Sequence, residues 1–434
     1  MQFTPAQVLQ LAPDDASAKA GRQLANATKW LTKCAHEKAL WGKCKGSGSA
    51  LYVTMVDLTN LAFKCSCPSR KFPCKHGLGL LLFYVNNADL LTKENNLAPH
   101  VAEWINRRAG KAEAKTQDKP TDEAAQRKRA EARTRKVESG IEELRIWLKD
   151  VVRTGIMQVP QNPYQFNKNI IARLIDAQAT GLAARVRAIN KINFYQEGWQ
   201  KSLLKRLANI YLLAEAYCNI NNFNDGLKQE IQMLIGWNSH KEDILKLLPV
   251  HDRWVILSKT IEEEDNLRTE RIWLYGIKTG QFALLLHFYA FNQQPQHIYI
   301  EGHTLEAELV FYPAALPLRA LVKQQIALKP VFTGVSGTTR LLTVHQQITA
   351  ALLKNPFIEK IPLLLSEVKL GFQDKNWFVT DAENRSLALT NTEDESWKML
   401  AISKGKAFSC FALHDQEKLD IHALWLDQKF YFLK

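Results

Sequence analysis

The pattern of apolar and polar residues changes along the chain, and each change marks an expected change of structure. Residues 1–102 mix short apolar runs with turn residues, which indicates a small unit that contains helices and a hairpin. Residues 137–246 carry apolar side chains at helical spacing and predict a helical domain. Residues 247–434 consist mainly of short apolar runs bounded by turn residues, which predict a β-rich domain. We therefore expect a multidomain α+β fold.

The helical domain is expected to be a bundle of four to six helices. Its first helix is indicated by apolar residues that recur at helical spacing: Ile141, Leu144, Ile146, Trp147, Leu148, Val151 and Val152. Further helices are expected at residues 167–177, 180–189, 199–218 and 227–237. The glycine at position 181 and the asparagine at position 190 lie near the expected helix boundaries.

The β-rich domain opens with three apolar runs, 254–260, 271–276 and 282–288, which predict a meander. Further extended segments are expected at residues 305–312, 377–380, 397–402, 406–410 and 429–433, and a helix at 343–353. Because no stretch repeats itself at a fixed period, the pattern does not favour a propeller or a solenoid.

In residues 1–102, a short helix is expected from Ala6 to Leu11 and a second one from Ala16 onwards, with helical spacing up to Cys34. Residues 42–49 are rich in Gly and Ser and are expected to form a loop. Two strands, at 51–57 and 61–65, predict a hairpin, and residues 74–85 have the length and apolar content of a buried helix.

Four potential metal ligands fall within twelve residues at the end of this hairpin: Cys65, Cys67, Cys74 and His76. Residues two apart in a strand share a face, so the first two thiols can point at one ion. Pro68 and Pro73 confine the loop that returns the last two ligands to the same place. Three thiolates and one imidazole complete a tetrahedral shell, which suits a structural zinc ion and leaves no position for a substrate.

The cysteines allow two other interpretations. The first is a buried cysteine cluster or a disulfide, but a reducing compartment favours metal binding at such spacing. The second is an additional metal site at Cys34, His36 and Cys44. Those residues offer only three candidate ligands, and ordinary packed or exposed side chains are the preferred interpretation.

The ligand spacing resembles the SWIM zinc finger, whose pattern is Cys-x-Cys, a variable gap and Cys-x-His. The flanking residues 41–48 and 65–78 resemble bacterial SWIM zinc finger family proteins, as do segments near residues 4–25 and 176–183. All four ligands match the pattern without departure. The resemblance extends over the N-terminal half of the chain at least.

This resemblance implies zinc binding, with DNA-binding or protein-interaction roles of the kind proposed for SWIM modules in general. Genes for the bacterial members often lie beside those for MoxR-type AAA+ ATPases and von Willebrand A-domain proteins, so these two classes are the partners that the resemblance implies. It implies no enzymatic activity.

The formal net charge of +13 is concentrated near the N-terminus. Residues 1–100 contain 12 Lys or Arg against 6 Asp or Glu, and residues 101–136 contain 11 against 6, whereas residues 246–434 are balanced at 21 against 21. Residues 103–136 are expected to form a basic linker that becomes helical towards its end. This asymmetry indicates an anionic partner or a basic domain that charge keeps soluble.

Two functions follow as hypotheses. The leading one is a zinc-binding protein-interaction or adaptor module, with DNA contact as an added role. The alternative is a DNA- or RNA-binding protein that contacts phosphates through basic residues near the metal site: Lys43, Lys45, Arg70, Lys71 and Lys75. Catalysis is not expected, because the chain has no nucleophile motif, paired carboxylates or complete phosphate-binding loop. The first residues lack a basic stretch followed by an apolar run, and no apolar run is long enough to span a bilayer, so a cytoplasmic location is expected.

Overall fold

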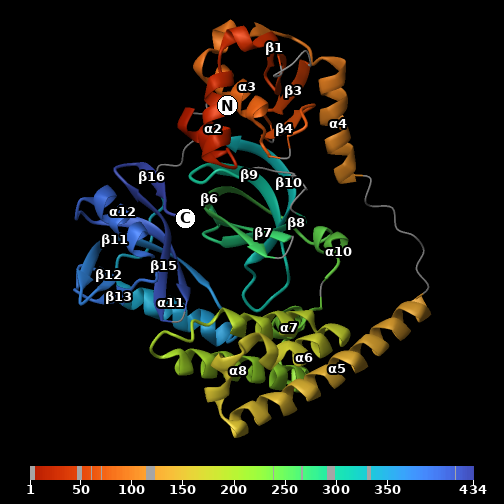
Figure 1. Ribbon diagram of the computed structural model, residues 1–434, viewed down its shortest axis with the longest axis vertical. Coiled ribbons are helices and arrows are strands. Elements are labelled where there is room, and N and C mark those ends of the chain that lie inside the picture. The colour runs from red at the N-terminus through yellow and green to blue at the C-terminus, as the bar shows by residue number, and fades with distance from the viewer. Residues whose placement is uncertain are drawn as a thin grey trace.

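The computed structural model describes residues 5–45, 51–59, 61–69, 71–113, 123–237, 239–264, 267–290, 299–329, 334–415 and 417–434. They form an N-terminal unit, a helical bundle, a closed β-barrel and a C-terminal sheet (Figure 1). The barrel lies between the N-terminal unit and the bundle, and the C-terminal sheet lies beside it. The multidomain α+β class expected from the sequence is confirmed. Among the helices described, none has the length and apolar character needed to cross a membrane.

The N-terminal unit is built on one five-stranded sheet in the order β4-β3-β2-β1-β5. The strands are β1 (Trp30–His36), β2 (Ala39–Lys45), β3 (Leu51–Asp57), β4 (Ala62–Cys65) and β5 (Thr92–Lys93). The helices are α1 (Pro5–Gln10), α2 (Asp15–Leu24), α3 (Lys75–Asn86) and α4 (Pro99–Glu113), with 3-10 turns at Ala27–Lys29 and Ala88–Leu90. The predicted hairpin is β3–β4, and the predicted buried helix after it is α3.

Helices cover both faces of this sheet. On one face, Leu40 and Val56 belong to a buried cluster with Leu81 of α3. On the other face, Trp41 belongs to a cluster with Trp104 of α4. Successive residues of a strand point to opposite faces, so the two clusters divide β2 between them. This division decides where the charged residues of β2 project.

The helix predicted from Ala16 to Cys34 is wrong beyond Leu24, because Trp30–His36 forms strand β1. The indole N–H of Trp30 donates to the backbone carbonyl of Leu24 at 2.8 Å, which fastens the turn between helix and strand. The strand then pairs antiparallel with β2, and the ring of Trp30 is buried against the backbone of Gly42. Pairing with a partner strand thus outweighs the helical spacing of the apolar residues. The residues expected to form a loop at 42–49 begin inside β2, and 46–49 lie outside the described residues.

The predicted helical bundle is confirmed. It consists of α5 (Glu123–Thr154), α6 (Pro163–Asp176), α7 (Thr180–Arg187), α8 (Trp199–Cys218) and α9 (Asp225–Ile235), with 3-10 turns at Ile156–Gln161, Ala188–Lys191 and Ile220–Asn222. The helices share one apolar core. Helix α7 approaches α9 so closely that a Cβ atom on Gly181 would lie 2.1 Å from the carbonyl oxygen of Leu234. The short helix α10 (Lys241–Leu245) leads to the barrel.

The predicted meander is present as β6 (Val250–Glu264), β7 (Leu267–Gly276) and β8 (Phe282–Ala290). Two further strands, β9 (Thr304–Phe311) and β10 (Arg319–Lys329), close it into a barrel in the order β10-β8-β7-β6-β9. The closure depends on the pairing of β6 with β9 and on a short parallel pairing of β10 with β8. Trp254 fills the barrel interior, and its ring N–H donates to the carbonyl of Ala307 at 3.2 Å.

The C-terminal unit is a six-stranded sheet in the order β13-β12-β11-β14-β15-β16. Its elements are α11 (Leu341–Lys354), β11 (Ile361–Gln373), β12 (Asn376–Thr380), β13 (Ser386–Ala388), α12 (Glu393–Ser403), β14 (Phe408–Asp415), β15 (Lys418–Leu426) and β16 (Lys429–Phe432). The extended segment predicted at 397–402 is wrong, because it lies in α12. A capping box of Thr392 and Glu395 starts this helix, and Lys404 in the left-handed conformation ends it.

The barrel packs against the C-terminal sheet through a second apolar cluster. Val255, Leu257 and Trp273 of the barrel meet Phe411 and Trp425 of the sheet in this cluster. The interface therefore buries the outer face of β6 as well as its inner face, which explains why β6 is apolar on both sides around residues 254–257.

Candidate metal centre

The four predicted ligands come from two elements and the loop between them. Cys65 is the last residue of β4, and Cys67 follows two residues later. The chain then passes a cis peptide bond between Phe72 and Pro73, and Cys74 is the N-cap residue of α3. His76 lies in the first turn of that helix. A ligand set that joins a strand end to a helix start can fix the angle between them.

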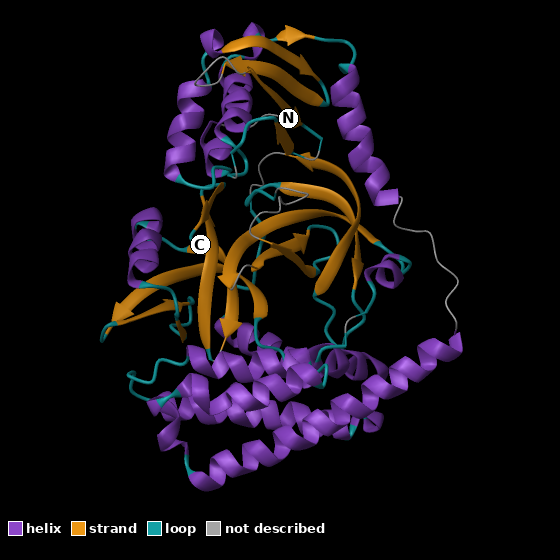
Figure 2. Cartoon of the chain, turned by 45° about the vertical axis from the view of Figure 1, so that its right-hand side comes forward, coloured by secondary structure: helices purple, strands orange, loops and turns teal. Residues whose placement is uncertain are grey.

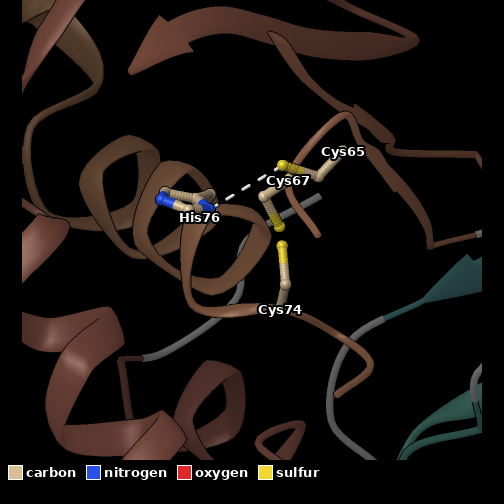
Figure 3. Close-up of side chains that lie close together, drawn as sticks. All are labelled: Cys65, Cys67, Cys74 and His76. Carbon is tan, nitrogen blue, oxygen red and sulfur yellow. Dashed lines mark hydrogen bonds between the residues drawn. The ribbon is translucent and has the colours of Figure 1, made fainter. Parts of the chain in front are cut away.

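The structure brings all four ligands together. The three Sγ atoms and one imidazole nitrogen lie within 4.8 Å of one another. Sγ of Cys65 is 3.8 Å from Nδ1 of His76 (Figure 3). Cys74 and His76 are buried, with 6% and 3% of their surface exposed, whereas Cys65 and Cys67 are half-buried. A search of the described residues for three or more Cys, His, Asp or Glu side chains that could share one ion finds this group.

Neighbouring strands hold the first ligand in place. Thr54 is the cross-strand partner of Cys65, and its hydroxyl lies 3.3 Å from Sγ of Cys65. One residue further, Ser66 extends the pairing: its N–H donates to the carbonyl of Val53 at 3.0 Å, and its hydroxyl accepts from the N–H of Val53 at 2.9 Å. These contacts continue the hairpin beyond β4 and orient the loop that carries Cys67.

Packing from both sides positions His76 as well. The ring of Tyr52 lies 5.0 Å from the imidazole of His76, centre to centre. Next to it, Gly77 faces the ring of Phe63, and a Cβ atom on Gly77 would lie 2.8 Å from Cδ1 of Phe63. Only a residue without a side chain fits there, so the glycine allows α3 to approach β4.

The protonation of the thiols fits a metal site. A hydrogen bond from the thiol of Cys74 is the main cause that lowers the pKa of Cys65 to about 3, and hydrogen bonds involving His76 and Thr54 contribute to the same shift against the effect of burial. The same interaction with Cys65 raises the pKa of Cys74. Burial raises the pKa of Cys67. The pocket therefore already favours negative charge on one sulfur, and Zn²⁺ is the ion that prefers three thiolates and one imidazole in a closed set.

The residues of the possible second metal site, Cys34, His36 and Cys44, do not converge on one position. Cys34 packs with the apolar cluster beneath α4, whereas Cys44 is buried in the cluster beneath α3. The two thiols thus lie on opposite faces of the sheet. His36 accepts a hydrogen bond at Nδ1 from the N–H of Lys38 at 3.1 Å, within the turn that follows β1.

The candidate phosphate-binding residues are also divided between two faces. Lys43 and Lys45 alternate with Cys44 in β2 and follow Trp41 on the α4 side of the sheet. Lys71 and Lys75 belong to the metal loop and the first turn of α3, on the other side. The ammonium group of Lys71 is 2.7 Å from a carboxylate oxygen of Asp14. Arg70 lies outside the described residues.

Two supporting residues were not predicted from the sequence. Thr54 could have been found from the hairpin register, because it is the residue opposite Cys65 once the turn is placed. For Asp14, the sequence is compatible with a place at the start of α2 but gives no sign of a contact with Lys71. Asp14 caps α2 and pairs with Lys71, 57 positions later in the sequence, a contact that only the packing of α2 beside the metal loop creates.

Comparison with family models identifies two regions of the chain. Residues 54–84 match the SWIM zinc finger, and residues 132–235 match the SWIM-associated four-helix bundle domain. The first match covers the second half of β3, β4, the ligand loop and most of α3, and the second covers the bundle from within α5 to the end of α9. No curated protein and no solved structure matched the chain.

Proposed function

We propose that this chain, which carries a SWIM zinc finger and a SWIM-associated helical bundle, is a zinc-binding adaptor that holds partner proteins. The observation that carries the first half of this proposal is the convergence of four ligand atoms within 4.8 Å. Cys65, Cys67, Cys74 and His76 would hold the ion, which supplies four strong bonds and a positive charge that stabilises the thiolates.

The role proposed for zinc is structural. Four protein ligands complete a tetrahedral shell, and two of the four are buried, so the ion has no open position for a reacting water. The ion would tie the end of β4 to the start of α3. That helix supplies Leu78, Leu81 and Phe83 to the core of the N-terminal unit, so the order of the whole unit depends on this connection.

We propose no catalytic role for the chain. Ser258, His422 and Asp420 follow one another through hydrogen bonds and have the residue types of a hydrolase triad. However, Ser258 exposes 3% of its surface and His422 exposes 5%, because both lie in the interface between the barrel and the C-terminal sheet. A hydroxyl in that position supports the packing of two units instead of meeting a substrate.

The adaptor role is supported by the placement of charge and by the size of the remaining chain. The candidate basic residues lie on two faces of the N-terminal sheet, and Lys71 is engaged by Asp14. Beyond the zinc finger, the chain has three further structural units, two of which carry balanced charge. The partners proposed are a MoxR-type AAA+ ATPase or a von Willebrand A-domain protein, in keeping with the sequence resemblance.

The competing proposal is nucleic-acid binding. It is supported by the charge asymmetry, since residues 1–136 contain 23 Lys or Arg against 12 Asp or Glu. Lys75 is exposed in the first turn of α3, next to the metal ligands, and could contact a phosphate together with Lys71.

Zinc content and thermal unfolding test the structural role. We expect the full chain to bind one zinc per molecule, and Cys67→Ala to lose it together with the stability of the N-terminal unit, because metal binding supplies much of a small finger's folding energy. The matched control is Cys218→Ala, which removes an exposed thiol of α8 far from the site. A Cys67→Ala protein with full zinc content and an unchanged unfolding midpoint would contradict the proposal.

Direct binding separates the two partner classes. The zinc-loaded chain, freed of nucleic acid, is tested against the source genome's MoxR-type ATPase and von Willebrand A-domain protein, and against labelled single- and double-stranded DNA at low and moderate salt. Saturable binding of either protein supports the adaptor. DNA binding that falls steeply with salt, and that is lost in Lys71→Glu/Lys75→Glu, supports the alternative and overturns the adaptor if neither protein binds.

A further inference from the structure

The surface of the helical bundle carries an apolar groove between α5 and α8. We call it the α5–α8 groove, and it has a volume of about 490 Å³. Its lining residues are Leu148, Lys149, Val152 and Arg153 of α5, and Leu204, Leu207, Ala208 and Tyr211 of α8. It lies within the segment that matches the SWIM-associated four-helix bundle.

The groove follows from the way in which these two helices pair. Arg145 of α5 donates to Glu215 of α8 at 2.7 Å. The lining residues that follow Arg145 in α5 lie beside residues that precede Glu215 in α8, so the two helices run antiparallel with that ion pair at one end. Leu148 and Leu207 belong to the bundle core and are each only 3% exposed, so they form the floor. Ala208 is small and leaves room above them.

The rim of the groove exposes apolar side chains to water. Val152 is 60% exposed and Leu204 is 46% exposed. Helix α5 runs along the side of the bundle that faces away from the barrel, so the other structural units do not cover it (Figures 1 and 2). A partner that covers this rim would remove apolar area from water, which stabilises the complex by roughly 25 cal/mol for each Å² buried. An apolar hollow with an exposed rim is typical of a binding surface.

The charge around the groove selects the kind of occupant. Its two charged lining residues, Lys149 and Arg153, are both basic. Arg153 pairs with Asp150 of the same helix at the long distance of 3.8 Å, and both side chains are exposed. At the far end, Glu215 is already engaged by Arg145, which also pairs with Glu142. The charged residues that line the groove itself are therefore basic and lie beside an apolar floor.

We infer that the α5–α8 groove binds an acidic amphipathic helix of a partner protein, an inference that rests on the proposed adaptor function. The eight residues from Leu204 to Tyr211 make about two turns, or roughly 10 Å, of α8. An occupant of that length presents apolar side chains at positions i, i+3 or i+4, and i+7 to the floor, which is the usual spacing for a helix that binds in a groove. Its acidic residues lie against Lys149 and Arg153.

The test uses a displayed library of helical peptides with randomised sequences, selected on the full zinc-loaded chain. Leu204→Glu places a charge on the apolar rim at an exposed position, so it removes binding without unfolding the bundle. The matched control is Leu212→Glu, because Leu212 lies on the same helix, is 49% exposed and does not line the groove. We expect enriched peptides to be acidic with apolar residues at helical spacing, to bind Leu204→Glu at least about tenfold more weakly, and to bind Leu212→Glu as well as the native chain.

Other outcomes overturn the inference. Enriched peptides without acidic bias, peptides that bind Leu204→Glu and the native chain equally, or no enrichment would each show that the groove is not such a site. Self-association in sedimentation that Leu204→Glu abolishes would assign the groove to a second copy of the chain. Binding to vesicles of anionic phospholipid that Leu204→Glu abolishes would assign it to a lipid surface.

The groove and the adaptor function can fail independently of each other. If the candidate ATPase or von Willebrand A-domain protein binds the native chain and Leu204→Glu equally, and the library yields no acidic helices that Leu204→Glu rejects, the adaptor proposal stands and the groove proposal falls. If neither candidate binds but the library yields acidic helices that Leu204→Glu rejects, the groove proposal stands and those two candidates are eliminated.

Discussion

The hydroxyl of Ser258 lies 2.7 Å from Nδ1 of His422, and this hydrogen bond joins the barrel to the C-terminal sheet across a buried interface. The other ring nitrogen of His422 is 3.2 Å from a carboxylate oxygen of Asp420. A carboxylate can only accept, so Nε2 carries a proton and, in the neutral ring, Nδ1 accepts from the serine hydroxyl. The carboxylate of Asp420 thus determines the direction of both hydrogen bonds: His422 donates to Asp420, and Ser258 donates to His422.

The first prediction concerns this hydrogen bond. Ser258→Ala leaves Nδ1 of His422 buried without a donor, so we expect it to lower the free energy of unfolding by about 1–3 kcal/mol. Ser202→Ala, at an exposed position of α8, is the control and should change it little. Denaturant unfolding followed by tryptophan fluorescence measures both. Equal stability of Ser258→Ala and the native chain would show that the bond contributes nothing to the interface.

The second prediction concerns acid stability. Burial alone would raise the pKa of Asp420, but hydrogen bonds from His422 and Lys434 outweigh it and lower the pKa to about 2. A depressed folded-state pKa contributes stability that is fully present above the unfolded-state pKa of about 3.9 and is lost as the pH falls towards 2. We expect roughly 2 kcal/mol to be lost in that window.

Asp420→Asn isolates this effect. The metal ligands also take up protons in acid, but they do so in both proteins, so the difference between the two unfolding curves reports Asp420 alone. Between pH 4 and pH 2 the native chain should lose more stability than Asp420→Asn. Equal losses of stability in the two proteins over that range would mean that folding does not lower the pKa of Asp420.

The third prediction concerns the approach of α3 to β4. Gly77→Ala places a methyl group 2.8 Å from the ring of Phe63, which forces α3 and its ligand His76 to shift. We expect weaker zinc binding, measured by competition with a chelator, and a loss of about 1–3 kcal/mol of stability. Adding Phe63→Leu makes room and should restore part of the zinc affinity. A double variant no better than Gly77→Ala would show that this contact is not the cause.

The fourth prediction separates the two roles of Asp14. Its side chain accepts from the N–H of Ser17 at 2.7 Å and so caps α2, while Lys71 and this cap together lower its pKa to about 2. Asp14→Asn keeps a capping oxygen but loses the charge, whereas Asp14→Ala loses both. Because the ion pair is exposed, the cap should matter more. We therefore expect hydrogen exchange at the Ser17 amide to accelerate in Asp14→Ala and to stay nearly unchanged in Asp14→Asn. Equal acceleration in both variants would assign the stability to the ion pair.

Features that depend on neighbouring residues could be predicted from the sequence. The four ligands fall within twelve residues, so the chain between them can only be a short loop that returns to its start. The hairpin 51–65, the buried helix after it and the bundle from residue 137 follow from period-two and helical spacing in the same way. Helix α8 was predicted with its bounds, 199–218, because its apolar residues recur at helical spacing over its full length.

Two of the wrongly predicted segments show where local spacing misleads. Residues 30–34 fit a helical stripe, but they form a strand because β2 offers hydrogen bonds and a buried site for Trp30. Residues 397–402 look like an apolar strand, but the capping box at Thr392 begins a helix before them. In the first case, pairing with the next strand outweighs the helical spacing, and in the second the helix cap lies just before the apolar segment.

The sequence by itself determined the metal ligands, the hairpin that carries them and the helical domain, because each depends on residues close together in the chain. The tertiary structure alone decided that β9 and β10 close the barrel, that Lys43 and Lys71 lie on different sides of the N-terminal sheet, and that α5 and α8 leave an apolar groove between them. Each of these depends on which distant segments pack together. That choice is made by the burial of apolar area over the whole molecule, which no local pattern records.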